Sequence, residues 1–359
     1  MQKNLSSEKR KKPLTINDIA KEAGVAKSTV SKVLNEQRGV SQETRRKVLK
    51  AVKKLNYHPS VIARSLKSKR TKAVGLILPN IINPFFPAIL KGVEDTAIEN
   101  GYVVVFCDSD DRKEKESLYF QIFENRWVDG IIFSGITGDK QEEKYIRSIH
   151  EKGTPVVLID REIEDYFTNV VMIDNKRAGF DATSYLLKLG HRKIGCITGP
   201  QNIKIFVKRL EGYRRALEKY NVDFNPDLVE EGDLSIESGR SATKKLLKKK
   251  ITFTAIFAST DLMAIGCIRE LQENGIKIPS DVSVIGIDNI PLASLVTPSL
   301  TTIAQPAYEM GVEAMNLLIK NIEKRGVLKS KIILPTELVV RKSTKPVVKN
   351  KDLSVSYVQ

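Results

Sequence analysis

From Lys72 onward, short apolar segments alternate with longer segments whose apolar residues recur at helical spacing. Strands are predicted at residues 74–78, 103–108, 130–133, 156–160, 194–198, 255–258 and 282–288. Helices are predicted between them at residues 86–100, 115–125, 179–189, 209–219, 238–247, 261–273 and 307–320. Repeated strand–helix units favour parallel sheets that helices cover on both faces. Because residues 73–342 exceed one comfortable sheet, we predict an α/β fold of two lobes with a cleft between them.

The positive charge of the chain is concentrated at its start. Residues 1–72 hold 20 of the 59 Lys and Arg residues but only 5 of the 43 Asp and Glu residues. Such a concentration is typical of nucleic-acid binders, because neutralised phosphates release their counterions. A solvated, solubilising surface would show the same charge. The spacing and type of the residues within this segment distinguish nucleic-acid binding from a solubilising surface.

The basic segment predicts three short helices, at residues 16–23, 27–35 and 42–56. Thr15 and Asp18 resemble a capping box, Gly24 ends the first helix, and Ser41 caps the third. Outward residues of the second helix are short or cationic hydrogen-bonding groups suited to a major groove, namely Lys27, Ser28, Thr29, Ser31 and Lys32. Two helices joined by a short glycine turn, followed by a supporting helix, form a helix-turn-helix. A plain three-helix bundle is the alternative, and the outward polar set favours DNA binding.

Residues 14–72 resemble the headpiece and hinge of the LacI/GalR (lac repressor) family of bacterial transcription regulators. The resemblance implies that Lys27, Ser28 and Lys32 read base edges and that Arg38 is a further DNA contact. It also implies a hinge at residues 59–68 that is disordered alone and helical on operator DNA. One departure is Ala26, where the family usually has a serine that caps the second helix.

Within the implied hinge, Leu66 matches the leucine that inserts into the minor groove at the centre of the operator. A leucine at this position unstacks a base step and bends the duplex. Ala63 matches the small residue that lets two hinge helices approach each other, and Lys67 belongs to the basic surroundings of Leu66. A helix–core anchor is the alternative role of Leu66, but these surroundings are unlike a core.

Ligands of parallel sheets bind beyond the carboxyl ends of the strands, and polar side chains gather at those positions in this sequence. The candidate effector-binding residues are Asn83, Phe85, Phe86, Asp160, Arg161, Arg209, Thr260, Asp288 and Gln305. Carboxylates, guanidinium groups and carboxamides can bind a polyhydroxylated ligand, because each hydroxyl both donates and accepts. Aromatic rings would cover the C–H faces of a sugar.

These positions resemble the ribose contacts of periplasmic sugar-binding proteins, and the surrounding runs resemble ribose-operon repressors. Two residues depart from the ribose pattern: Thr260 replaces an asparagine, and Leu234 replaces a stacking phenylalanine. Another pentose or a hexose therefore stays open. Simpler structural roles also stay open, with Phe85 and Phe86 as core residues and Asp261 as a helix cap. Asp160 and Arg161 would then form a surface ion pair.

Enzymatic readings have little support in the sequence, which has no phosphate-cradling glycine motif. Asp160 and Asp288 resemble a glycosidase pair in residue type. We expect the arginines nearby to keep both carboxyls ionised, which favours hydrogen-bond acceptance over general-acid catalysis. No cofactor or metal is expected.

The cysteines Cys107, Cys196 and Cys267 lie far apart in apolar runs, as in a reduced cytoplasmic protein.

The sequence thus predicts a homodimeric repressor of a sugar operon, ribose being the first candidate, that leaves palindromic operator DNA when a sugar binds between the lobes. The alternative is a global carbon catabolite control regulator whose corepressor is a phosphorylated carrier protein. The tail lacks the leucine heptads of a tetramer seam, so a dimer is expected. The predicted organisation is a basic flexible arm (1–13), a headpiece (14–58), a hinge (59–72), a two-lobed effector-binding and dimerisation domain (73–342) and a disordered tail (343–359).

Overall fold

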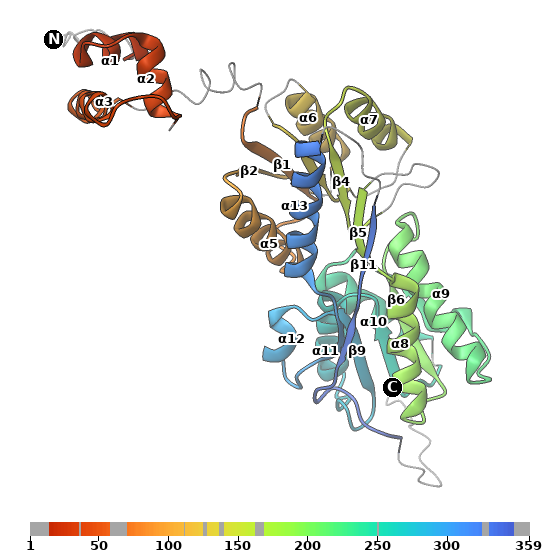
Figure 1. Cartoon of the computed structure of the whole chain (residues 1–359). Coiled ribbons are helices and arrows are strands. Elements are labelled where there is room, and N and C mark those ends of the chain that lie inside the picture. The colour runs from red at the N-terminus through yellow and green to blue at the C-terminus, as the bar shows by residue number, and fades with distance from the viewer. Residues whose placement is uncertain are drawn as a thin grey trace, which may run out of the picture. The chain divides into compact units, whose positions relative to one another are not determined.

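The structure, a computed structural model, describes residues 14–35, 37–57, 70–110, 112–124, 128–135, 140–161, 169–249, 251–324 and 330–347. The chain divides into two compact units, Met1–Thr71 and Lys72–Gln359. Figure 1 shows the helices and strands of both units.

The amino-terminal unit contains the three predicted helices, α1 (Ile16–Ala23), α2 (Lys27–Leu34) and α3 (Gln42–Lys54). The backbone N–H of Thr15 donates to the Asp18 carboxylate over 2.7 Å, which caps α1, and Gly24 ends it in the left-handed conformation at φ 63°. The Ser41 hydroxyl accepts from the Thr44 N–H and caps α3. One apolar cluster holds the helices together, formed by Ile19, Val30, Val33, Val48 and Ala51. The predicted helix-turn-helix fold is confirmed.

The larger unit contains two six-stranded sheets. The first sheet has the order β11-β5-β4-β3-β1-β2 and defines the amino lobe; the second has the order β12-β10-β9-β8-β6-β7 and defines the carboxyl lobe. The strands of the first are β1 (Ala73–Leu78), β2 (Val103–Asp108), β3 (Ile131–Phe133), β4 (Val156–Ile159), β5 (Asn169–Ile173) and β11 (Lys331–Leu334). Those of the second are β6 (Ile194–Thr198), β7 (Val229–Glu231), β8 (Ala255–Ala258), β9 (Ser283–Asp288), β10 (Thr301–Ala304) and β12 (Glu337–Val339).

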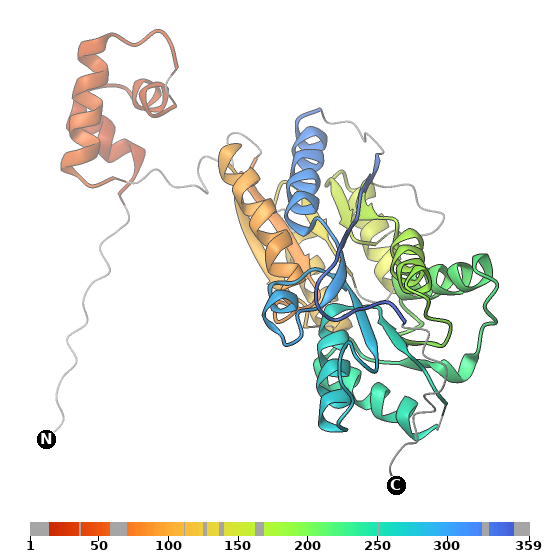
Figure 2. The ribbon, with the colours of Figure 1, turned by 90° about the horizontal axis from the view of Figure 1, so that it is seen from below.

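Among the residues that the structure describes, all strand pairs are parallel except that of β10 with β12. The helices of the unit are α5 (Phe85–Glu99), α6 (Lys113–Glu124), α7 (Lys140–Glu151), α8 (Asn175–Lys188), α9 (Lys204–Lys219), α10 (Ile236–Lys248), α11 (Asp261–Glu273), α12 (Pro291–Leu295) and α13 (Ala307–Lys324). The chain passes between the lobes after β5, after β10 and after β11, so each lobe contains segments far apart in sequence. Figures 1 and 2 both show α13 beside α5, covering the amino lobe. The predicted two-lobed α/β fold is confirmed.

Helices α8 and α9 pack against each other in the carboxyl lobe through two glycines. A Cβ atom on Gly179 would overlap the backbone carbonyl oxygen of Arg209, and one on Gly212 would overlap that of Lys176. Only a residue without a side chain permits this close approach. The contact fixes the position of Arg209 relative to the first turn of α8.

The carboxyl-terminal tail differs from its prediction at residues 343–347. The Ser343 side chain is fully buried, and its hydroxyl donates to the Val284 carbonyl oxygen over 2.6 Å. The backbone N–H of Val347 donates to the Leu189 carbonyl oxygen over 2.8 Å. Polar composition suggested disorder here, but these hydrogen bonds attach the segment to the carboxyl lobe. The predicted tail boundary at residue 343 is therefore wrong.

Within the residues that the structure describes, every helix is too short or too polar to traverse a bilayer.

Candidate functional site

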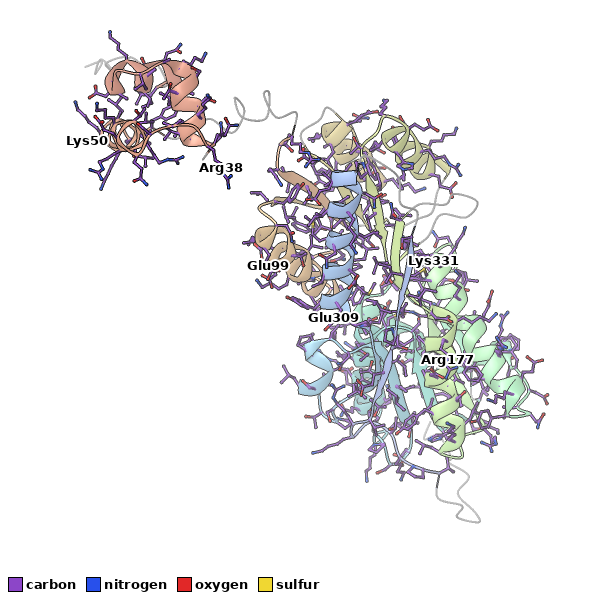
Figure 3. The ribbon with its side chains drawn as sticks, in the orientation of Figure 1. Arg38, Lys50, Glu99, Arg177, Glu309 and Lys331 are labelled. Carbon is purple, nitrogen blue, oxygen red and sulfur yellow. The ribbon has the colours of Figure 1, made fainter. Side chains whose placement is uncertain are left out.

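The exposed side of α2 carries the predicted DNA-contacting residues. Lys27, Ser28 and Lys32 are exposed, and Thr29 is half-buried. Arg38 lies beyond the helix, where its exposed side chain is labelled in Figure 3. Within the described residues, Lys27, Lys32 and Arg38 form no ion pair, so their charge faces solvent. Ala26 is the N-cap residue before α2 and forms no side-chain hydrogen bond, as expected from the missing serine. Ala63, Leu66 and Lys67 lie outside the described residues.

Four of the predicted effector residues meet at the carboxyl ends of the strands. Asp160 directly follows β4 of the amino lobe, while Asp288 ends β9 and Gln305 directly follows β10 in the carboxyl lobe. Arg209 extends from α9, and its side chain lies 3.7 Å from the Asp288 carboxylate, measured from Nη1 to Oδ1. All four residues are buried. Asn175 of α8 joins them, because it accepts a hydrogen bond from Arg209. We call Asp160, Asn175, Arg209, Asp288 and Gln305 the interlobe cluster.

Arg209 is held by carboxyl-lobe groups on more than one side. Its Nε donates to the Asn175 Oδ1 atom over 2.8 Å, and its Nη1 donates to the Ser259 carbonyl oxygen over 2.5 Å. Sequence reasoning missed Asn175, because β5 was not predicted. Asn175 begins α8 shortly after the carboxyl end of β5, so the same strand-end rule would have found it.

Several buried polar atoms of the interlobe cluster have no hydrogen-bond partner within the described part of the chain. They are Asp160 Oδ1, Asn175 Nδ2 and Gln305 Oε1. Buried polar groups are nearly always paired, because an unmade hydrogen bond costs about 1–3 kcal/mol. Two acceptors and one donor therefore form a ready partner set for a ligand whose hydroxyls both donate and accept.

Burial changes the ionisation of the two cluster carboxyls. It raises the pKa of Asp160, although the charges of Arg209 and Arg161 act in the opposite direction. Burial also raises the pKa of Asp288 to about 8, against the influence of Arg209 and of the Gln305 amide, which donates to Asp288 Oδ1 over 2.6 Å. The expectation that the arginines keep both carboxyls ionised is wrong for Asp288, because desolvation of its carboxyl outweighs the attraction of the guanidinium group.

The backbone at the cluster is strained, and a buried carboxylate supports it. Asp160 has φ 65° and Asp288 has φ 129°, in a region that side-chain-bearing residues rarely adopt. Asp261 accepts from the Ile290 N–H over 3.0 Å and from the Thr302 hydroxyl over 2.6 Å. It thereby fastens the turn after Asp288 to the neighbouring strand. The expected role of Asp261 as the helix cap is wrong, since Thr260 caps α11 by accepting from Met263 N–H.

The other predicted effector residues have structural contacts of their own. Asn83 Oδ1 accepts from the Phe85 N–H over 3.1 Å at the start of α5. Phe85 is 5% exposed in the main core, with its ring edge-on to Phe86 at a centroid distance of 5.3 Å. Arg161 is half-buried beside Asp160. Ligand contacts of all the predicted effector residues, including the four that meet in the interlobe cluster, stay predictions.

A basic helix-turn-helix unit and a two-lobed unit with a buried polar cluster between its sheets together define a DNA-binding regulator with a ligand-binding domain. Residues 15–60 match the family of bacterial regulatory proteins, lacI family, and residues 183–344 match the periplasmic binding protein-like domain. The chain belongs to the LacI family of transcription regulators.

Individual relatives match along nearly their whole length. The chain is 39% identical to the ribose operon repressor of Halalkalibacterium halodurans, over 92% of this chain and 97% of that protein. It is 38% identical to catabolite control protein A of Priestia megaterium, over 92% of this chain and 99% of that protein. Among solved structures, the lac repressor dimer bound to operator and the anti-inducer ONPF aligns with a TM-score of 0.84 and 28% identity, over 93% of this chain and 100% of that one.

Proposed function

We propose that the protein is a sequence-specific repressor of a sugar-utilisation operon and that a small sugar bound at the interlobe cluster releases it from its operator. The observation that carries this proposal is the set of buried, unpartnered polar atoms contributed by both lobes. A sugar that satisfies Asp160 on one lobe and Asn175 and Gln305 on the other would favour one relative orientation of the lobes. The coupling between sugar and operator would be about 1–3 kcal/mol and reciprocal.

Ribose is the first candidate for the sugar. The matching cluster residues and the similarity to a ribose operon repressor support it. Thr260 and Leu234 differ from the ribose pattern, so other pentoses and hexoses belong in the same titration. If ribose tightened operator binding, its assignment as inducer would be wrong.

The second candidate function is catabolite control with a phosphorylated carrier protein as corepressor. The 38% identity to catabolite control protein A supports it almost as strongly as the 39% identity supports a ribose repressor. A carrier-protein corepressor does not need an intact sugar site, and the interlobe cluster therefore favours the sugar. A pull-down with the phosphorylated carrier protein, compared with a sugar titration, separates the two functions.

On the DNA side, Lys27, Ser28, Thr29, Lys32 and Arg38 would contact a half-site, and two headpieces of a homodimer would read a palindrome. The hinge residues Ala63, Leu66 and Lys67 would contact the operator centre. Action on bacterial DNA implies a cytoplasmic location. We propose no enzymatic activity, which a turnover assay with the bound sugar tests.

Calorimetric titration of the full chain against a panel of pentoses and hexoses tests the sugar site. We expect one sugar to bind and Asn175→Ala to weaken it about ten-fold, because the variant loses a donor and the support of Arg209. Asn225→Ala is the matched control, since Asn225 caps a short helix at Pro226–Leu228 outside the cluster. No binding by any sugar, or equal binding by Asn175→Ala and the unmodified chain, would contradict the proposal.

A further inference from the structure

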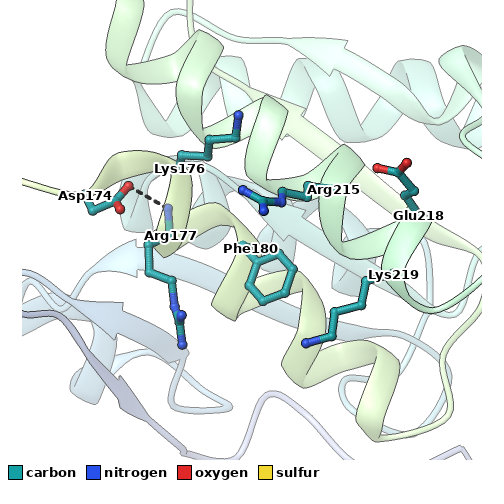
Figure 4. A pocket seen from close by; sticks show the side chains of 7 residues that line it. All are labelled: Asp174, Lys176, Arg177, Phe180, Arg215, Glu218 and Lys219. Atoms are coloured by element: carbon teal, nitrogen blue, oxygen red, sulfur yellow. Dashed lines mark hydrogen bonds between the residues drawn. The ribbon is translucent and has the colours of Figure 1, made fainter.

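The outer surface of the carboxyl lobe carries a pocket of about 600 Å³ between α8 and α9, on residues that the effector site does not use. Figure 4 shows the side chains that line it. They are Asp174, Lys176, Arg177, Phe180, Arg215, Glu218 and Lys219. We call this the basic pocket, because four of its side chains are cationic and two are acidic. Its volume lies in the range of small-molecule sites.

The acidic side chains near the basic pocket are partly used by other contacts. Asp174 accepts from the Arg177 backbone N–H over 2.9 Å and caps α8. Arg177 pairs with Asp181 over 2.7 Å, and Lys176 pairs with Glu211 over 3.0 Å. These pairs leave two cations and one carboxylate, that of Glu218, as the charged groups of the pocket without an ion pair within the described residues, so the two cations are only partly compensated.

Those two cations are Arg215 and Lys219, which are exposed and lie four residues apart on α9. Neither forms an ion pair within the described residues. Like charges at this spacing repel each other, so binding of an anion between them would be favourable. A guanidinium and an ammonium group together suit a phosphate, which offers several charged acceptor oxygens.

Phe180 gives the basic pocket an apolar floor. Its ring packs partly against the main core, and Lys219 Nζ lies 5.3 Å from the ring centroid, with Arg177 Cζ at 5.8 Å on the same ring. Figure 4 shows the ring between these two side chains, with Arg215 beside it. A second pocket of about 560 Å³ shares Lys176, Arg215 and Glu218 with the first, so a ligand could extend beyond its phosphate.

We propose that the basic pocket binds a phosphate-bearing small molecule, with Arg215 and Lys219 holding the phosphate and Phe180 contacting the organic part. The volume favours a small molecule over an acidic protein partner. Lys176 of the pocket directly follows Asn175, and Asn175 accepts from Arg209 of α9 over 2.8 Å. A ligand that fastens α8 to α9 therefore acts on two residues of the interlobe cluster. This coupling, unlike the binding itself, rests on the proposed sugar site.

Calorimetric titration of the full chain with phenyl phosphate and with inorganic phosphate, at constant ionic strength, tests the binding. We expect phenyl phosphate to bind more tightly, because its ring can contact Phe180, and Arg215→Ala/Lys219→Ala to weaken it at least ten-fold. Lys244→Ala/Lys248→Ala is the matched control, since these exposed lysines have the same spacing on α10 and line neither pocket. Both double variants remove the same net charge, so general electrostatics affects them equally.

Absence of phenyl phosphate binding, or equal weakening in both double variants, would overturn the proposed site. Binding of a polyglutamate peptide without binding of phenyl phosphate would overturn it in favour of a protein partner.

The coupling is tested by repeating the sugar titration with phenyl phosphate at saturation. We expect at least a three-fold change in sugar affinity in the unmodified chain and none in Arg215→Ala/Lys219→Ala. Unchanged sugar affinity in the unmodified chain would overturn the coupling. If the sugar bound neither the unmodified chain nor Arg215→Ala/Lys219→Ala, that result would count against the sugar site instead.

Discussion

At the scale of single residues, Asp288 combines a functional position with an unfavourable environment. It is 6% exposed, burial raises the pKa of its carboxyl to about 8, and its backbone has φ 129°. The neighbouring Asp160 and Asp261 carboxyls raise this pKa further, while Arg209 lowers it. Such a residue is expected where the protein retains a costly group for ligand binding and not for stability.

The pH dependence of stability tests this view through Asp288→Asn, which keeps the shape and removes the ionisable group. A folded-state pKa near 8, against an unfolded value near 4, means that the folded unmodified chain binds an extra proton between these values. The unmodified chain therefore loses stability as the pH rises from about 4 to about 8, and the variant escapes this loss. Denaturant unfolding at pH 5 and pH 8 should show a larger advantage, or a smaller deficit, of the variant at pH 8. A difference between the two proteins that is the same at both pH values would refute the raised pKa.

At the scale of helices and strands, strong local patterns were predictable and short edge elements were not. The buried strand at Val156–Ile159 and the capped helix at Gln42–Lys54 each carry their own signal in apolar spacing or cap residues. By contrast, β7 and β12 have three residues each, too few to show a period, and their pairing depends on distant strands. Because β5 was not predicted, Asn175, which follows it, was missing from the predicted site. A missed strand thus caused a missed hydrogen-bonding residue.

The site itself was predictable only as a set of residue types at strand ends. Sequence position brought Asp160, Asp288 and Gln305 together correctly, because they lie at the carboxyl ends of parallel strands in the two lobes, and Arg209 reaches them from α9. The ionisation of the carboxyls was not predictable, since it depends on how completely both lobes exclude water. The structural role of Asp261 was likewise not predictable, because it depends on Thr302 of β10, which is distant in sequence.

The start of α2 offers a prediction about a helix cap. Ala26→Ser supplies the missing acceptor for the first turn, and an N-cap serine contributes about 1 kcal/mol relative to alanine. Hydrogen exchange of the amides of α2 should slow about five-fold. Ala26→Val serves as control, because valine has no acceptor. Equal exchange in Ala26→Ser and the unmodified chain would show that the cap does not limit this helix.

The close contact of α8 with α9 offers a second prediction at this scale. Gly179→Ala places a methyl group against the Arg209 carbonyl oxygen, so the helices must separate at a cost of about 1–3 kcal/mol. Both the melting temperature and the sugar affinity should fall. Gly92→Ala is the control, because its added methyl would overlap the Tyr308 carbonyl oxygen at the equivalent contact of the amino lobe. It should reduce stability without a comparable loss of sugar affinity, and an equal loss in both variants would contradict a local effect on Arg209.

At the scale of the whole molecule, we expect a second copy to bind where apolar side chains are exposed. Val103 and Val105 of the edge strand β2 are 67% and 41% exposed, and Ile98 of the adjacent α5 is 65% exposed. Exposed edge strands with apolar side chains favour association. We expect Val103→Glu to shift the protein toward monomer in sedimentation velocity. Ile333→Glu, at an exposed position of β11, is the control; dissociation by both, or by neither, would contradict this interface.

The most direct test of the account is the effect of sugar on operator binding. A palindromic duplex is first selected from random sequences with the full chain, and its binding is then followed by fluorescence anisotropy with increasing concentrations of each pentose and hexose. We predict that one sugar weakens operator binding at least five-fold, in line with a coupling of about 1–3 kcal/mol, and that Asn175→Ala requires more of that sugar. Operator binding that stays the same at every concentration of every sugar, or that becomes tighter with the sugar that binds, would contradict release by a sugar between the lobes.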